Sequence, residues 1–249
     1  MNNMVSLFQK SSPGVRAILI HTVFAVFKII YVLFWAPGLF FEEAQYWLWS
    51  KYLDWSYYSK PPLIAWINYS STSIFGDNEL GVRINAIVCG WFIAFFVYRI
   101  AHDLTKNQRK AMWASLSLLI FPYFWIISIF FTTDSLVTLF WVVALYFLLR
   151  FVRRKSISGI YMGVAIGMGL LSKYVMALFV PFVLTYIFLF HREKYRSPAL
   201  YLGLVIAGLM CFPIVYWNYI KDWVTVRHLG HLAGDSAEYS LINSLKYLG

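Results

Sequence analysis

Seven apolar stretches follow one another along this chain, and each is long enough, or nearly so, to cross a lipid bilayer. A spanning helix needs about 20 predominantly apolar residues. Hydrophobic residues make up 61% of the chain and charged residues 13%, which leaves too little polar surface to cover a soluble globule. The sequence therefore predicts an all-α, polytopic transmembrane helix bundle of about seven spans. The stretches are residues 17–38, 80–101, 111–131, 135–151, 157–171, 174–190 and 198–217.

The charged residues separate by sign between the two ends of these expected spans. With the N-terminus in the cytoplasm, 12 of the 21 Lys and Arg residues fall in cytoplasmic loops, whereas nine of the 11 Asp and Glu residues fall on the opposite side. Cytoplasmic loops are enriched in Lys and Arg, so loop 39–79 is expected to face outward. The net charge of +10 reflects this topology, and we expect no nucleic-acid partner.

The outward loop contains an aromatic-rich polar segment, FEEAQYWLWSKYLDWSYYSKPPLIAW, at residues 41–66. Its aromatic residues follow helical spacing, which predicts an amphipathic helix at residues 43–53 on the membrane surface. The three-and-four spacing places Glu42, Gln45, Tyr46 and Trp49 on one face of that helix. Pro61 and Pro62 suit the first turn of a new helix, so a second short helix is expected after them, with Lys60 at its start.

Several ionisable residues at this end are candidates for chemistry. Glu42 and Glu43 fit two interpretations, the solvated start of a helix or an acid–base site. Lys60 can bind lipid headgroups as a surface lysine or hold a reacting phosphate. Asp134 in TTDSL can cap a helix, and Lys173 in LLSKY interrupts an apolar stretch. Ionisable groups near membrane spans are costly, which makes such a group of residues a functional candidate.

Other polar residues favour structural interpretations. Arg83 lies near the outer start of the second span, where it can pair with an outer acid. His21 and Lys28 lie inside the first span and are expected to be internal to the bundle or to reach toward headgroups. His228 and His231 flank a glycine without an acidic ligand pattern, which is a weak metal signal. The two cysteines, Cys89 and Cys211, lie in apolar stretches, so neither disulfide nor redox chemistry is expected.

At these motifs the chain resembles the GT-C fold membrane glycosyltransferases, in particular the bacterial relatives of dolichyl-phosphate-mannose protein mannosyltransferases. That group includes lipid A aminoarabinose and galacturonic acid transferases. The resemblance runs from the first span almost to the last residue. Because members of that family generally continue through further spans, the chain resembles their N-terminal half. The matching motifs are the segment 41–66, FGDNELGVR (75–83), TTDSL (132–136), GLLSKY (169–174) and WNYIKDWVTVRHLG (217–230).

The resemblance implies an inverting sugar transfer in the bacterial inner membrane. The donor would be a polyprenyl-phosphate-linked sugar, and the acceptor a lipid A, a polysaccharide or a protein of the envelope at the periplasmic face. We expect a single transmembrane domain over residues 1–249, with loop 39–79 carrying the site. A degenerate, non-catalytic membrane fragment and a transporter of lipid-linked sugars are the alternatives.

The resemblance also assigns roles to residues. Glu42 stands where the family has its presumed catalytic base, usually Asp, and Glu43 stands at the second acidic position. Lys60 and Lys173 correspond to cations that contact the donor phosphate, and Asp134 to an acid that orients the loop. Tyr58 is also expected at the substrate. Ser59 stands where some relatives carry an acid near a metal, so we predict no metal and no other cofactor.

Overall fold

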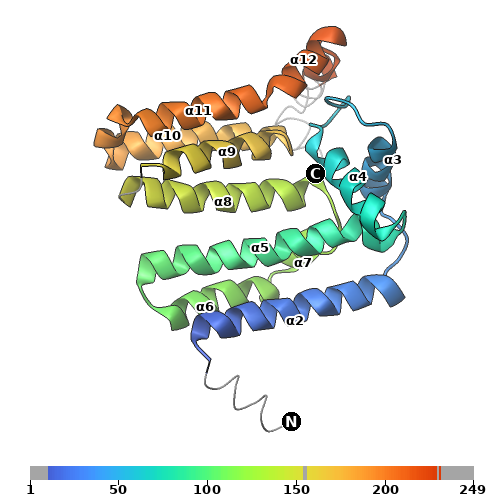
Figure 1. Cartoon of the computed structure of the whole chain (residues 1–249), viewed down its shortest axis with the longest axis horizontal. Coiled ribbons are helices and arrows are strands. Elements are labelled where there is room, and N and C mark those ends of the chain that lie inside the picture. Colours follow the sequence, from blue (N-terminus) through green and yellow to red (C-terminus); the bar gives the residue numbers. More distant parts are fainter. Residues whose placement is uncertain (1–10, 154–155, 229, 231–249) are drawn as a thin grey trace, which may run out of the picture.

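A computed structural model of the protein describes residues 11–153, 156–228 and 230. Within these residues the fold is all-α, without strands, which confirms the predicted class. Figure 1 shows the long helices lying side by side, with the short helices α3 and α4 gathered at one end. The elements are α2 (Pro13–Phe34), α3 (Phe41–Lys51), α4 (Leu63–Phe75), α5 (Glu79–Thr105), α6 (Gln108–Leu116), η1 (Ser117–Ile120), α7 (Pro122–Ile127), α8 (Thr133–Arg153), α9 (Ser158–Leu170), η2 (Tyr174–Leu178), α10 (Phe179–Phe190), η3 (Arg192–Arg196), α11 (Pro198–Met210) and α12 (Phe212–Ile220).

Four segments of the described chain are long and apolar enough to cross a membrane, and two shorter apolar helices accompany them. The chain is therefore a membrane protein by helix length and composition. The four segments are Pro13–Phe34, Glu79–Thr105, Thr133–Arg153 and Pro198–Ile220, and the shorter helices are Ser158–Leu170 and Tyr174–Phe190.

The expected span at residues 111–131 is not one continuous helix. It divides into α6, the 3₁₀ turn η1 and the six-residue α7. Pro122 explains the break, because proline lacks an N–H and fits only the first turn of a helix. The indole of Trp125 donates a hydrogen bond to the carbonyl of Leu119 at 2.7 Å, which satisfies one backbone acceptor beside the break. The short helix α7 is thus separated from α6.

The two expected surface helices of the outward loop are present. The first, α3, covers Phe41–Lys51, two residues earlier than predicted, and carries Glu42 and Glu43 in its first turn. The second, α4, begins at Leu63, directly after the two prolines. Together they pack across the end of the bundle where α5 and α8 begin (Figure 1).

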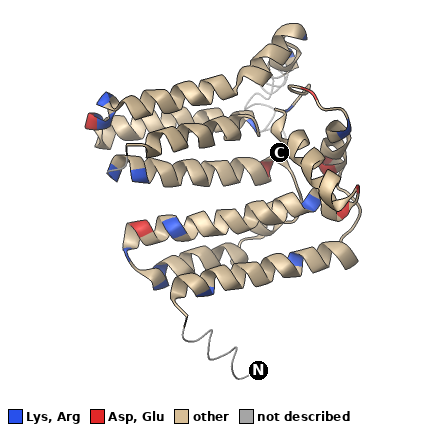
Figure 2. Ribbon diagram, in the orientation of Figure 1, with Lys and Arg blue, Asp and Glu red and all other residues tan. Residues whose placement is uncertain are grey.

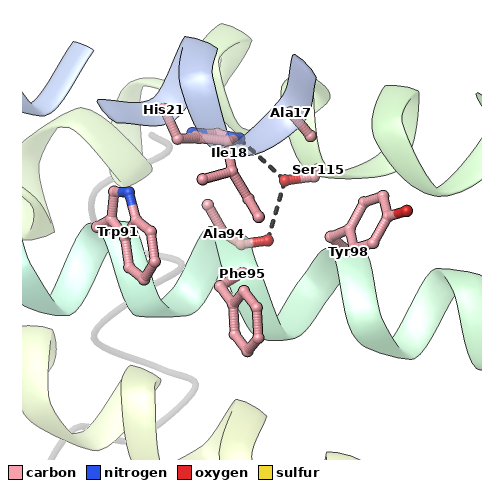
Figure 3. A pocket seen from close by; sticks show the side chains of 8 residues that line it. All are labelled: Ala17, Ile18, His21, Trp91, Ala94, Phe95, Tyr98 and Ser115. Carbon is pink, nitrogen blue, oxygen red and sulfur yellow. Dashed lines mark hydrogen bonds between the residues drawn. The ribbon is translucent and has the colours of Figure 1, made fainter. Parts of the chain in front are cut away.

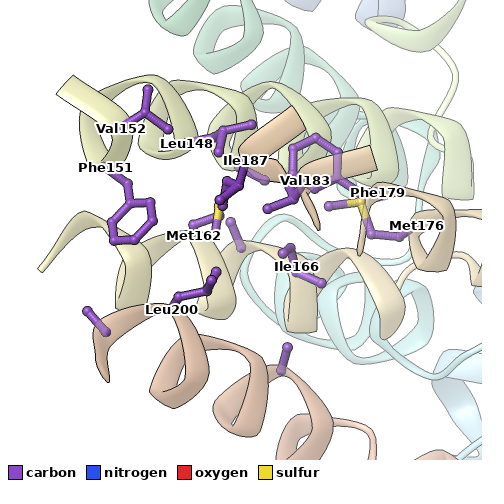
Figure 4. Packing of buried hydrophobic residues seen from close by; sticks show 14 of the residues in the cluster. Leu148, Phe151, Val152, Met162, Ile166, Met176, Phe179, Val183, Ile187 and Leu200 are labelled. Carbon is purple, nitrogen blue, oxygen red and sulfur yellow. The ribbon is translucent and has the colours of Figure 1, made fainter. Parts of the chain in front are cut away.

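The largest buried apolar cluster joins α8, α9, α10 and α11 (Figure 4). Small residues allow α9 and α11 to approach closely. A Cβ atom on Gly163 would lie 2.0 Å from the carbonyl oxygen of Gly203, and one on Gly203 would lie 2.2 Å from that of Gly159. Such close backbone packing at small residues is typical of helix pairs in membranes.

The polar residues of the first span are internal to the bundle, as one of the two interpretations predicted. His21 shares a hydrogen bond of 2.9 Å with Ser115, whose hydroxyl donates to the carbonyl of Ala94 at 2.9 Å (Figure 3). The cavity beside His21 has a volume of only about 10 Å³. Lys28 donates to Ser128 and lies 4.8 Å from the ring of Trp125. Both residues therefore fasten α2 to the segment that contains α6 and α7.

Charged residues gather mainly at the two ends of the helices (Figure 2). One end carries α3, α4 and the first turn of α8, with the acids Glu42, Glu43 and Asp134. The other carries the basic last turn of α8, with Arg150 and Arg153. The expected grouping of acids at one end is thus present in the folded chain.

Candidate active site

Glu43 and Arg83 form an ion pair in the interior. Their side chains are both 0% exposed, and the Nη2 atom of Arg83 lies 2.8 Å from the Oε2 atom of Glu43. The Nε atom of Arg83 donates to both carboxylate oxygens, and its two Nη atoms donate to the carbonyls of Pro37 and Gly38 at 2.9 and 3.0 Å. The backbone N–H groups of Phe40 and Phe131 each donate to the carboxylate at 3.0 Å. The structural pairing expected for Arg83 is confirmed.

This arrangement differs from the predicted role of Glu43 at the substrate. Its carboxylate accepts five hydrogen bonds from the protein and has no exposed surface, so a ligand cannot reach it in this structure. A fully buried carboxylate needs such compensation, because desolvation of an unpaired charge is very unfavourable. Glu43 instead joins the start of α3 to α5 and to the segment before α8.

Glu42, the residue before Glu43, lines a cavity of about 440 Å³. Asp134, at the start of α8, lines the same cavity, so the structure brings these two predicted residues together. The remaining wall is mostly apolar and comes largely from the segment around α7. Its residues are Phe40, Tyr123, Ile126, Ile127, Phe130 and Thr132. The cavity therefore combines carboxylates with an apolar wall.

Asp134 forms an ion pair with Lys173, with 2.7 Å between the Oδ1 and Nζ atoms. The two side chains are 38% and 31% exposed, which leaves both accessible. Asp134 lies inside the first turn of α8, after the capping position, and its backbone N–H donates to the hydroxyl of Thr132 at 3.3 Å. A lysine at the edge of the cavity is thus held by one of the cavity's own carboxylates.

Tyr46 is a residue of this site that sequence reasoning did not single out. Its side chain is 0% exposed, and its hydroxyl has no hydrogen-bond partner of acceptable geometry among the described residues. The hydroxyl lies near Glu42, Thr133 and Asp134. Burial raises the pKa of Tyr46, and the negative charge of Glu42 raises it further. The signal was present in the sequence, because Tyr46 follows Glu42 by one helical turn on the shared face.

Lys60 lies in a loop that packs beside the Lys173 segment. The N–H of Tyr57 donates to the Lys60 carbonyl at 3.1 Å, and the N–H of Leu63 donates to the carbonyl of Leu171 at 3.0 Å. The Lys60 side chain is half-buried and makes no ion pair or hydrogen bond within the described parts of the chain. Lys60 is not among the residues that line the cavity of Glu42 and Asp134.

Tyr58 is exposed, and its ring lies 4.5 Å from that of His228. This contact brings the loop after α3 against the segment that follows α12. His231, the second histidine of the weak metal motif, lies outside the described residues. No contact connects Tyr58 with the cavity that holds Glu42 and Asp134.

Comparison with known proteins adds to this geometry. Residues 59–217 match the family described as dolichyl-phosphate-mannose-protein mannosyltransferase. The lipid A galacturonosyltransferase RgtD of Rhizobium johnstonii is 28% identical over 212 residues, which cover 84% of this chain and 45% of the relative. The undecaprenyl phosphate-alpha-4-amino-4-deoxy-L-arabinose arabinosyl transferase of Serratia proteamaculans is 26% identical over 261 residues, covering 92% of this chain and 46% of the relative.

A second arabinosyl transferase of this kind, from Proteus mirabilis, is 27% identical over 211 residues and is covered to 37% of its length. The chain therefore spans less than half the length of these curated relatives. No solved structure matches the chain significantly.

Proposed function

The chain belongs to the dolichyl-phosphate-mannose-protein mannosyltransferase family, and from that membership we propose that it is a glycosyltransferase. It moves a sugar from a polyprenyl-phosphate carrier to an acceptor of the bacterial envelope at the periplasmic face. The named relatives act on lipid A or use an undecaprenyl-phosphate aminoarabinose donor, so lipid A is the first acceptor to test. The observation that carries the proposal is that Glu42 and Asp134 line one cavity whose other walls are mainly apolar.

In the proposed reaction Glu42 is the general base. Its carboxylate takes the proton from an acceptor hydroxyl while that oxygen attacks the anomeric carbon of the donor sugar. The bond between the anomeric carbon and the phosphate oxygen breaks on the opposite face, and its electron pair leaves with the polyprenyl phosphate. The anomeric configuration is therefore inverted. General-base assistance of this type contributes about 10²- to 10⁴-fold to the rate.

The two lysines hold the donor phosphate and stabilise the charge it gains on leaving. Lys173 is positioned for this by its ion pair with Asp134. Lys60 supplies a second cation from the loop packed beside Leu171, where its charge is not neutralised by a carboxylate of the described chain. The apolar wall formed by Ile126 and Phe130 suits the first isoprene units of the carrier. The same cavity then accommodates both ends of an amphipathic donor.

The test is sugar transfer by Glu42→Gln. The purified protein in detergent is given undecaprenyl phosphate-α-4-amino-4-deoxy-L-arabinose or an undecaprenyl-phosphate galacturonate donor, with lipid A as the acceptor. We expect wild-type product and a loss of about 10²-fold or more in the variant, with normal membrane insertion. Glu79→Gln, which neutralises another acid at this end of the bundle, is the matched control and keeps wild-type transfer.

Three results would overturn the proposal. Retention of transfer by Glu42→Gln contradicts the assignment of the base. Absence of wild-type transfer with both donors, combined with uptake of a lipid-linked sugar into vesicles that contain the protein, would favour a transporter. Absence of both would favour a non-catalytic membrane protein.

A further inference from the structure

The buried hydroxyl of Tyr46 makes no hydrogen bond of ordinary geometry among the described residues, although Glu42 and Thr133 lie close to it. The residue belongs to the apolar cluster beneath α3 and α4 and has no exposed surface. A buried polar atom that is left unpaired is unfavourable, so most such atoms in folded proteins have a partner. An exception beside a cavity that contains carboxylates points to a partner that arrives with substrate or changes position when substrate binds.

The ring of Tyr46 cannot turn away from this position easily. Its ring centroid lies 5.4 Å from that of Trp49. The Trp49 ring in turn stacks on Tyr57, with 4.5 Å between the centroids and 5° between the planes. The hydroxyl of Tyr57 donates to the carbonyls of Trp49 and Tyr52 at 3.0 and 3.2 Å. These contacts fix the aromatic stack, and the hydroxyl of Tyr46 therefore stays beside the carboxylates.

The charged groups around this hydroxyl come from three parts of the chain. Glu42 lies on the same helix, one turn earlier, and Asp134 approaches from α8 with its partner Lys173. The third is the buried Glu43–Arg83 pair, whose two opposite charges neutralise each other. Burial raises the pKa of Tyr46, and the negative charges of Glu42 and Asp134 raise it further, so its hydroxyl acts as a donor and not as a base.

We propose that Tyr46 is a positioning residue for Glu42. When the substrates bind, the hydroxyl donates a hydrogen bond to one carboxylate oxygen of Glu42, so that the other oxygen points into the cavity toward the acceptor hydroxyl. The hydroxyl of Thr133, 1% exposed on the facing helix, supports the same arrangement. This inference rests on the proposed function, because Tyr46 orients the general base which that function requires.

The first test needs no activity. Thermal unfolding of ligand-free Tyr46→Phe is compared with that of the wild type. Removing an unpaired buried hydroxyl removes a desolvated polar atom without breaking a hydrogen bond, so the midpoint is expected to stay equal or to rise. A fall in the midpoint would mean that the hydroxyl is already paired for structural reasons, and it would overturn the inference.

The second test uses the transfer assay. Hydrogen bonds to charged groups correspond to roughly 10- to 100-fold in rate, so kcat of Tyr46→Phe should fall by that factor while KM for the donor changes little. The acid limb of the kcat profile, which reports the base in the enzyme–substrate complex, should also move to higher pH, because the ionised base loses a donor that stabilises it. An unchanged kcat and an unchanged profile would also overturn the inference.

Tyr174→Phe is the matched control. The hydroxyl of Tyr174 is also buried and unpaired among the described residues, but it lies near Ser56 and Thr225 and not near the carboxylates. This variant should leave the pH profile in place. Failure of the proposed function is recognised separately, because Glu42→Gln would then retain transfer whatever the behaviour of Tyr46→Phe.

Discussion

Arg83 and Glu43 meet in the interior with 2.8 Å between Nη2 and Oε2, and neither side chain is exposed to solvent. The same carboxylate accepts the N–H of Phe131, three residues before Asp134, and it belongs to the residue next to Glu42. One buried carboxylate thus fixes the start of α3 relative to the start of α8. The separation of Glu42 and Asp134 across the cavity depends on this pair.

We predict that Glu43→Gln strongly destabilises the protein. It leaves the guanidinium of Arg83 buried without a counter-charge, and breaking a buried pair from one side typically costs about 3–5 kcal/mol. The measurement is thermal unfolding in detergent. Arg83→Met combined with Glu43→Leu should recover part of the loss, because the unpaired charge is then removed. The exposed pair Lys51–Asp77 provides the control, and Asp77→Asn should change stability little. Equal effects of Glu43→Gln and Asp77→Asn would contradict this account.

We predict that Lys173→Met weakens use of the donor more than it weakens folding. The ion pair with Asp134 is more than 30% exposed on both sides, so its loss has a small effect on stability. Loss of a cation that holds phosphate should raise KM for the donor about tenfold. Lys51→Met removes a lysine at the same end of the bundle and should leave KM unchanged. A KM that is equal in all three proteins would exclude Lys173 from phosphate binding.

The lengths of the apolar stretches and the positions of the prolines predicted much of the fold. The apolar stretches predicted the helices, and Pro61 and Pro62 predicted the start of α4. The same reasoning was wrong at residues 111–131, because hydropathy is insensitive to one proline. Pro122 divides that stretch and creates α7, which supplies much of the cavity wall.

The site was less predictable, because sequence spacing does not specify which of two adjacent acids faces inward. Glu42 and Glu43 are the same residue type at adjacent positions, so the sequence alone does not distinguish their roles. Arg83, 40 residues later, decides between them by taking Glu43 into the interior. Asp134 and Lys173 were recognised as ionisable residues at one boundary, but their pairing depends on how α8 lies beside the segment after α9. Tyr46 shared a face with Glu42, but only packing buries its hydroxyl and leaves it unpaired within the described part of the chain.

Filling the apolar part of the cavity should impair binding of a lipid-linked donor. Ile126 lines the cavity and is 54% exposed, so Ile126→Trp can place its ring there without disturbing the core. We expect KM for the polyprenyl donor to rise about tenfold with little change in kcat, since lost apolar contact affects substrate and transition state alike. Ile120→Trp, at a site that is 81% exposed and does not line the cavity, is the control. Donor titration decides, and an unchanged KM in Ile126→Trp would mean that the carrier chain lies elsewhere.

The crossing of α9 and α11 provides a prediction about stability that is independent of the catalytic assignments. A Cβ atom at Gly163 would lie 2.0 Å from the Gly203 carbonyl oxygen and 2.4 Å from its Cα atom. Both are backbone atoms, so Gly163→Ala can be accommodated only if the two helices separate, at a cost of about 1–3 kcal/mol. Gly208 lies in α11 with nothing within 4 Å of its added Cβ. Gly208→Ala should therefore be neutral or stabilising by up to about 1 kcal/mol, because alanine favours the helix more than glycine does. Thermal unfolding of the two variants in the same detergent measures the difference. Equal midpoints would mean that α9 and α11 are not in backbone contact.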